Sequence, residues 1–158
     1  MTATAHALVG AAIASHVREP LLSGGLIVSS HFLLDAIPHW DFGTDWRKRT
    51  KAMTGFLAVA DAVFGFIAAI VVFFGTLPFW TIITAVSLAL LPDWVEAPWY
   101  IFYASREKKS PGNGASIPER ITYAIYSFES FVHSRADLPL GGLTQVGTVL
   151  FFFLLLHG

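Results

Sequence analysis

The sequence TGFLAVADAVFGFIAAIVVFFG, residues 54–75, gives the clearest indication of the fold class of this protein. A helix needs about 20 predominantly apolar residues to cross the hydrocarbon core of a bilayer, and this segment has that length and composition. One acidic residue, Asp61, interrupts it. The segment therefore predicts a membrane-spanning helix that contains a carboxylate.

The composition of the whole chain agrees with this prediction. Hydrophobic residues make up 54% of its 158 residues and charged residues 13%, whereas about 25% of a typical soluble domain is charged. Apolar residues are spread along most of the chain, which predicts a single domain over residues 1–158. A formal net charge of −1 argues against a nucleic-acid partner. The absence of cysteine excludes thiolate zinc sites and a cysteine nucleophile.

Further helices are predicted on both sides of residues 54–75. Prolines and turn residues delimit apolar segments at 3–17, 21–37, 79–91, 92–103 and 140–157, with a break near Pro92 in the fourth helix. Residues 117–133 have apolar positions at helical spacing and polar residues on the other faces, as in a helix that lies in the membrane interface. The predicted fold is an all-α polytopic membrane helix bundle with about five spans and one interfacial amphipathic helix.

Basic residues predict the orientation of these spans. They gather in two loops, Arg47, Lys48, Arg49 and Lys51 before residues 54–75 and Arg106, Lys108 and Lys109 after residues 92–103. Loops rich in Lys and Arg face the cytoplasm. Five spans then place the N-terminus in the cytoplasm and the C-terminus outside.

Histidines and aspartates recur at helical spacing near the end of the second predicted helix. The sequence HFLLDAIPHWD at 31–41 spaces His31, Asp35 and His39 four residues apart, so they share one face if the helix continues past Pro38. The predicted topology places four more such residues at the same cytoplasmic level, His6, Asp61, Asp93 and His133. We therefore expect these side chains to lie close together.

A metal cation is the expected partner of this group. An Asp inside a spanning helix costs about 2.5–3.5 kcal/mol unless it is paired, and the predicted spans contain no Lys or Arg. Imidazoles and carboxylates without thiolates suit Zn²⁺, as one or two ions, before Mn²⁺, Fe²⁺ or Mg²⁺. The predicted metal ligands are His6, His31, Asp35, His39, Asp93 and His133.

The sequence also predicts roles for individual acidic residues and for the other histidines. Asp35 and Asp61 are the candidate catalytic bases. Two alternatives remain for Asp41 and Glu96: each belongs to this group or is a solvated or interfacial acid. His16 and His157, at helix ends, are interpreted as hydrogen-bonded interface residues and are not included.

These residues resemble the motifs of a known family. The motifs are Thr4-Ala5-His6-Ala7-Leu8-Val9-Gly10, the LLPD segment at Leu90–Asp93 and the pair His133-Ser134. They resemble small bacterial inner-membrane metal-dependent hydrolases, one of which is described as LexA-binding. Residues 31–41 also resemble the His and Asp ligand helices of zinc-dependent phospholipase C. The resemblance implies hydrolysis and a location in the bacterial inner membrane. The chain departs from the Arg-Gly-x-Thr-His-Ser run of the family at Ser130-Phe131-Val132-His133-Ser134.

Three classes of function fit the pattern, each with the lipid bilayer as a partner. A metal-activated water and a carboxylate near the cytoplasmic interface favour a membrane-embedded hydrolase with a lipid-like or phosphoester substrate. A metal-ion or proton transporter is the second class, but it needs polar residues at several depths, and the outer halves of the predicted spans are nearly free of them. The third is a non-catalytic membrane scaffold with a structural metal site.

Overall fold

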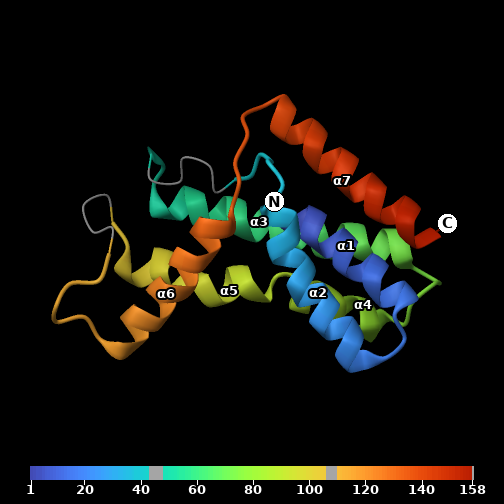
Figure 1. Ribbon diagram of the computed structural model, residues 1–158, viewed down its shortest axis with the longest axis horizontal. Coiled ribbons are helices and arrows are strands. Elements are labelled where there is room, and N and C mark those ends of the chain that lie inside the picture. Colours follow the sequence, from blue (N-terminus) through green and yellow to red (C-terminus); the bar gives the residue numbers. More distant parts are fainter. Residues whose placement is uncertain (43–47, 106–109, 158) are drawn as a thin grey trace.

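The computed structural model describes residues 1–42, 48–105 and 110–157 (Figure 1). Within these ranges the chain forms seven α-helices and one π-helical turn and contains no β-strand. The prediction of an all-α fold is confirmed. Most of the basic residues that predict the orientation, Arg47, Arg106, Lys108 and Lys109, lie outside the described residues.

The first helix, α1 (Ala3–His16), lies at the centre of the fold. The side chain of Thr2 caps its N-terminus by accepting a hydrogen bond from the main-chain N–H of Ala5. The middle of α1 consists mainly of small residues, and nearly all of them are buried. The helices that contact α1 are α2 (Pro20–Asp35), α3 (Lys51–Phe73), α4 (Phe79–Ala89) and α7 (Leu140–His157) (Figure 1).

Two glycines permit the closest of these helix contacts. A Cβ atom added to Gly10 in α1 would lie 2.8 Å from the Cβ atom of Ala89 in α4. A Cβ atom added to Gly65 in α3 would lie 3.2 Å from the Cβ atom of Ala7 in α1. Small residues let helix backbones approach closely. The small residues of α1 therefore allow the neighbouring helices to enclose it, together with the side chain of His6.

The fourth predicted helix is broken near Pro92, as the sequence indicates. Helix α4 ends at Ala89 and α5 (Leu91–Pro98) begins after Leu90, and the chain bends there by 49°. Pro92 lies in the first turn of α5. Main-chain N–H groups there have no partner within the helix, so the missing N–H of proline costs no helical hydrogen bond. The π-helical turn η2 (Trp99–Tyr103) then continues α5.

Helix α6 (Ile117–Val132) packs against α5 and η2, beside the bundle formed around α1 (Figure 1). The Ser116 side chain caps α6 by accepting a hydrogen bond from the N–H of Glu119. The Trp99 side chain is fully buried at this contact. Its ring lies 4.8 Å from the ring of Tyr123 and 5.9 Å from the ring of Tyr126. These aromatic contacts hold α6 close to the ends of α2 and α5.

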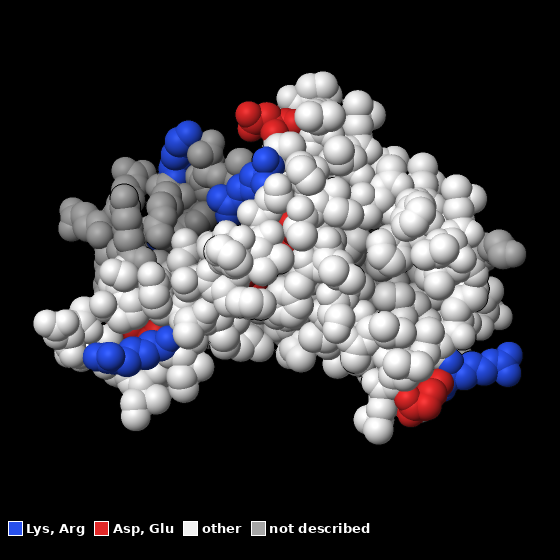
Figure 2. Space-filling view, in the orientation of Figure 1, with Lys and Arg blue, Asp and Glu red and all other residues white. Residues whose placement is uncertain are grey.

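Large apolar side chains cover much of the outer surface. In α3 only Gly65, Ala69 and Phe73 are buried. The outward-facing residues of α3 include Phe56, Val59, Val63, Phe64, Ile67, Val71 and Val72. Figure 2 shows a face that is mostly free of Lys, Arg, Asp and Glu, with the charged residues near its ends and upper edge. Apolar surface of this extent marks contact with a membrane or with another protein.

One or two candidate membrane spans are found among the described helices. Helix α3 is long and apolar enough to cross a membrane, and α4 with α5 and η2 adds a second candidate if the bent pair is one span. Five spans are not confirmed. Helices α1 and α2 have 14 and 16 residues, whereas a span needs about 20. In addition, α1 is enclosed by other helices and has little surface left for lipid.

We expect Gly10→Ala to destabilise the protein and Gly25→Ala to leave it equally or more stable. Alanine favours a helix by about 1 kcal/mol over glycine at both sites. At Gly10 the new methyl group would overlap Ala89, which costs about 1–3 kcal/mol, whereas no atom lies within 4 Å of a Cβ at Gly25. Thermal unfolding in detergent measures both variants. Equal melting temperatures would contradict the close packing of α1 on α4.

Candidate metal centre

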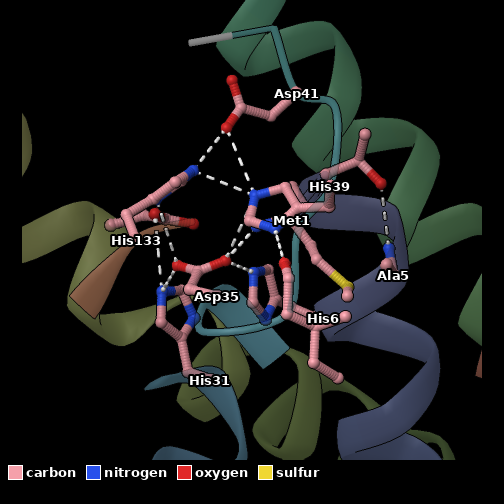
Figure 3. A network of polar contacts seen from close by, with 12 residues as sticks. Met1, Ala5, His6, His31, Asp35, His39, Asp41 and His133 are labelled. Atoms are coloured by element: carbon pink, nitrogen blue, oxygen red, sulfur yellow. Dashed lines mark hydrogen bonds and ion pairs between the residues drawn. The ribbon is translucent and has the colours of Figure 1, made fainter. Parts of the chain in front are cut away.

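Four segments that are distant in sequence bring histidines and aspartates together (Figure 3). His6 comes from α1, and His31 and Asp35 come from α2. His39 and Asp41 follow α2, and His133 follows α6. Asp93 in α5 and Glu129 in α6 border the group. The candidate metal centre consists of His6, His31, Asp35, His39, Asp41, Asp93, Glu129 and His133.

Main-chain hydrogen bonds join the end of α2 to the segment after α6. The N–H of Ser134 donates to the carbonyl oxygen of Asp35 at 2.7 Å, and the N–H of His39 donates to that of Ser134 at 3.3 Å. The N–H of Ala136 donates to the carbonyl oxygen of His39 at 2.8 Å. This short pairing places the side chains of His39 and His133 next to each other.

Asp35 lies at the middle of the centre, and its side chain is 7% exposed. Its Oδ1 atom is 3.1 Å from Nε2 of His6 and 3.7 Å from Nε2 of His39. Its Oδ2 atom is 3.3 Å from Nε2 of His31 and 3.6 Å from Nδ1 of His133. The amino group of Met1 also contacts Oδ1. One carboxylate therefore faces four imidazole rings.

Main-chain carbonyls set the tautomers of two of these rings. Nδ1 of His31 lies 2.7 Å from the carbonyl oxygen of Ala89, and Nδ1 of His39 lies 2.7 Å from that of Ile37. A carbonyl oxygen only accepts, so each Nδ1 carries the hydrogen and each neutral ring has its lone pair on Nε2. The Nε2 lone pair of His31 then faces carboxylate oxygens, whereas Nε2 of His39 lies 2.9 Å from Nε2 of His133 and 3.4 Å from Oδ2 of Asp41. A metal ion at Nε2 of His31, or a proton on that nitrogen, removes the repulsion between its lone pair and the carboxylates.

The arrangement of His31 and His39 is that of metal ligands in proteins. A ligating histidine usually donates its second ring N–H to a carbonyl or carboxylate, which orients the ring. Nε2 of His31 is fully buried and has no hydrogen-bond partner, and the same holds for Nδ1 of His6. The rings of His6 and His31 stack with their centroids 3.9 Å apart. Buried nitrogens without partners are rare in folded proteins, and a bound ion at His31 accounts for one of them.

Asp41, which the sequence leaves open, belongs to the centre. Its Oδ2 atom is 2.7 Å from Nε2 of His133 and 3.4 Å from Nε2 of His39. Burial alone would raise the pKa of Asp41, but the hydrogen bond from His133 and the nearby ring of His39 outweigh it and hold that pKa well below its ordinary value. The carboxylate is thus available as an anionic ligand or as the partner that orients His133.

Glu129 also borders the centre, and the sequence analysis missed it. Its carboxylate lies with His31 and Asp93 in one group whose ligand atoms are within 4.8 Å of one another. Glu129 is buried and shares a hydrogen bond with Glu96 of α5, and burial raises its pKa. The signal available in the sequence is its spacing of four residues before His133 in a helical segment.

The ligand atoms group into sets that share residues. The sets are His6, His31 and Asp35; Asp35, His39 and His133; and His31, Asp93 and Glu129. The one lone pair of His31 binds one ion, so the first and third sets describe alternative surroundings of the same ion. A carboxylate has two oxygens and can bridge two ions. Each set could hold a metal ion, and Asp35 belongs to two of the sets.

Asp61 lies apart from these sets and bonds to the start of α1. Its Oδ2 atom accepts from the N–H of Ala3 at 2.7 Å, and its Oδ1 atom accepts from the N–H of Thr4 at 3.2 Å. The Thr4 hydroxyl donates to Oδ1 at 2.8 Å. A carboxylate at a helix N-terminus satisfies N–H groups that have no partner within the helix. Asp61 therefore orients α1, which carries His6 one turn along the chain.

Glycine at position 141 supports the segment that carries His39. A Cβ atom at Gly141 in α7 would lie 2.6 Å from the main-chain nitrogen of Trp40 and 2.9 Å from the carbonyl carbon of His39.

We expect Gly141→Ala to displace His39 and to weaken metal affinity by about 10- to 100-fold, as loss of a group that orients a ligand does. Gly147→Ala in the same helix is the control, because no atom lies within 4 Å of its Cβ. Metal titration by calorimetry compares them, and equal affinities would contradict this role.

Replacement of Asp61 tests whether it supports α1 or acts in catalysis. We expect Asp61→Ala to lower stability by about 1–3 kcal/mol, because hydrogen bonds to a charged group are lost. The measurements are thermal unfolding and metal content after purification. A variant with unchanged stability and lost hydrolysis would instead favour the catalytic role.

Comparisons with known proteins identify no relative of this chain. No protein-family model, curated protein or solved structure matches it. The resemblance carried by the segments at residues 4–10, 90–93 and 133–134 thus stays an expectation from short motifs. Function has to be inferred from the geometry of the candidate metal centre.

Proposed function

We propose that the protein is a membrane-embedded metal-dependent hydrolase with a two-metal centre. The observation that carries this proposal is the orientation of His31 and His39. Each ring donates its Nδ1 hydrogen to a main-chain carbonyl, and its Nε2 atom points toward carboxylates and, for His39, toward Nε2 of His133. Metal ions bound at these nitrogens would satisfy the lone pairs and the carboxylates together, which supports the proposal.

The donor set favours zinc. Buried imidazole and carboxylate ligands without sulfur suit Zn²⁺ best, and Mn²⁺, Fe²⁺ or Mg²⁺ follow. In the proposed centre, His6, His31 and Asp35 hold one ion, while Asp35, His39 and His133 hold the other. Asp41 lies at the second set, 2.7 Å from His133. Asp93 lies at the first, 3.7 Å from Nε2 of His31.

Hydrolysis is the chemistry that such a centre supports best. A divalent cation there would lower the pKa of a water molecule toward about 7 and polarise a carbonyl or phosphoryl oxygen. Asp35 has both oxygens directed at histidines, so it acts in the proposal as the shared ligand. Asp93 has a 42% exposed side chain at the edge of the centre. Its position favours it as the group that accepts a proton from water.

The surface supports a location in a membrane. Helix α3 is a candidate span whose outer side chains are almost all apolar, and α7 exposes Leu143, Val146, Leu150 and Leu154. We propose a multi-pass position in the bacterial inner membrane with the N-terminus and the centre on the cytoplasmic side. In this proposal the short helices α1 and α2 cross as part of the bundle, where neighbouring helices rather than lipid surround α1.

Metal content and activity of matched variants test the proposal. We expect about two zinc ions per purified chain and loss of about one ion in His31→Ala or His39→Ala. His16→Ala is the control, since the His16 ring bonds to Ala12 and Ser15 outside the centre. Elemental analysis gives the content. Chelation should lower the melting temperature of the wild type, because bound ligands stabilise the folded state.

The activity measurement separates a hydrolase from the other functions. A screen of lipid esters and phosphoesters, with chelator and after zinc is restored, should show hydrolysis only with metal. Metal-dependent flux through proteoliposomes without hydrolysis would favour a transporter. A protein that purifies without stoichiometric metal and is unaffected by chelation would falsify the proposal.

A further inference from the structure

An apolar groove runs between α2, α5 and α6, outside the set of histidines. Its volume is about 420 Å³, within the range of roughly 300–1,000 Å³ found for small-molecule sites. Phe32 lines it from α2, Pro92 and Val95 line it from α5, and Ile125 and Phe128 line it from α6. Glu129 is the one acidic residue in its lining.

The groove is continuous with the candidate metal centre. Glu129 belongs both to the groove and to the group with His31 and Asp93. Phe32 directly follows His31 in the chain, and Pro92 directly precedes Asp93. The ring of Phe32 lies 5.6 Å from the ring of His31 and 5.4 Å from the ring of Phe128. One end of the groove therefore adjoins the centre, while the lining surface itself is almost entirely apolar.

Two residues of the centre that adjoin the groove elements are partly exposed. The side chains of His6, His31, Asp35 and His39 are 7% exposed or less. The Asp93 side chain is 42% exposed and that of His133 is 17% exposed. Asp93 follows the groove residue Pro92, and His133 follows α6, which forms one wall. A molecule that reaches the centre at Asp93 would extend along the groove.

We propose that this groove binds one alkyl chain of a membrane lipid, whose ester or phosphoester group then lies at Asp93. The inference rests on the proposed hydrolase function and names its substrate class. Apart from Glu129 the lining comes from apolar residues, so a polar ligand would lose its hydrogen bonds to water there. An alkyl chain has no hydrogen bonds to lose. A helix of another protein is about 10–12 Å wide and would cover the groove without reaching the centre.

The paired variants Ile125→Trp and Ile121→Trp test the groove. Both residues lie on α6, but only Ile125 lines the groove, and Ile121 is exposed outside it. The probe is phosphatidylcholine with a photoreactive diazirine at the end of one acyl chain, in nanodiscs that hold the zinc-loaded protein. Mass spectrometry maps the labelled residues, and zinc content is measured for every variant.

We expect labelling to concentrate at Val95 and Phe128 in the wild type and in Ile121→Trp, and to fall by about tenfold in Ile125→Trp. Uniform labelling over the exposed apolar surface, or labelling that Ile125→Trp leaves unchanged, would overturn the groove proposal. A dimer cross-linked through the groove would also overturn it, since a second copy would then be the occupant.

Hydrolysis measured on the same samples distinguishes this inference from the proposed function. Ile125→Trp should raise KM by about tenfold for a long-chain lipid ester and leave both KM and kcat unchanged for a short-chain, water-soluble ester. Equal effects on both esters would overturn the role of the groove in substrate binding. If groove labelling is found but no ester is hydrolysed by the zinc-loaded wild type, the hydrolase proposal fails while lipid binding in the groove stands.

Discussion

The buried carboxylate of Asp35 is the group on which the rest of the site depends. It lies among four imidazoles that reach it from three directions, α1, the end of α2 and the segment after α6. A buried charge is costly unless it is paired and hydrogen-bonded. The amino group of Met1 and Nε2 of His6 both contact the Asp35 carboxylate, whereas Nε2 of His31 is buried without a hydrogen-bond partner. A metal ion between Asp35 and the ring of His31 would satisfy that nitrogen, which is why we interpret the cluster as a candidate metal centre.

The packing of the helices brings the residues of this site together. His6 can reach Asp35 because α1 lies at the centre of the bundle, and α1 can lie there because its residues are small. The carbonyl of Ala89, which orients His31, is available because α4 ends at that residue and α5 turns away by 49°. Carbonyls in the last turn of a helix lack partners within it. The break before Pro92 therefore supplies the hydrogen-bond acceptor that sets the tautomer of His31.

The polar centre and the apolar groove meet at Glu129, whose surroundings differ from those of Asp41. Asp41 receives a hydrogen bond from His133, and its pKa is lowered. Glu129 is buried beside Glu96 and Asp93, and its pKa is raised. The two sides of the centre are thus unlike, one lined by histidines and one bordered by acids and more open, at Asp93. A substrate approaching from the groove side meets the acidic edge first, which is consistent with Asp93 as the proton acceptor.

Much of the fold and the site could be predicted from the sequence. Apolar periodicity, prolines and caps located the helices and the break near Pro92, because these signals act within a few residues. The spacing of His31, Asp35 and His39 predicted that these side chains share one face, and they do meet at one centre. His39 lies beyond the end of α2, however, so pairing with residues 134–136, rather than helical spacing, places it there.

The sequence by itself determined the helices and the residue types that can bind a metal, since both depend on local spacing and chemistry. Tertiary structure decided which of these residues meet. Asp61 matches the sequence pattern of a site residue, but the close approach of α1 and α3 directs its carboxylate to the start of α1. Glu129 is inconspicuous in the sequence, yet packing of α6 on α5 brings it to His31. Apolarity alone also does not reveal that α1 is covered by other helices and not by lipid.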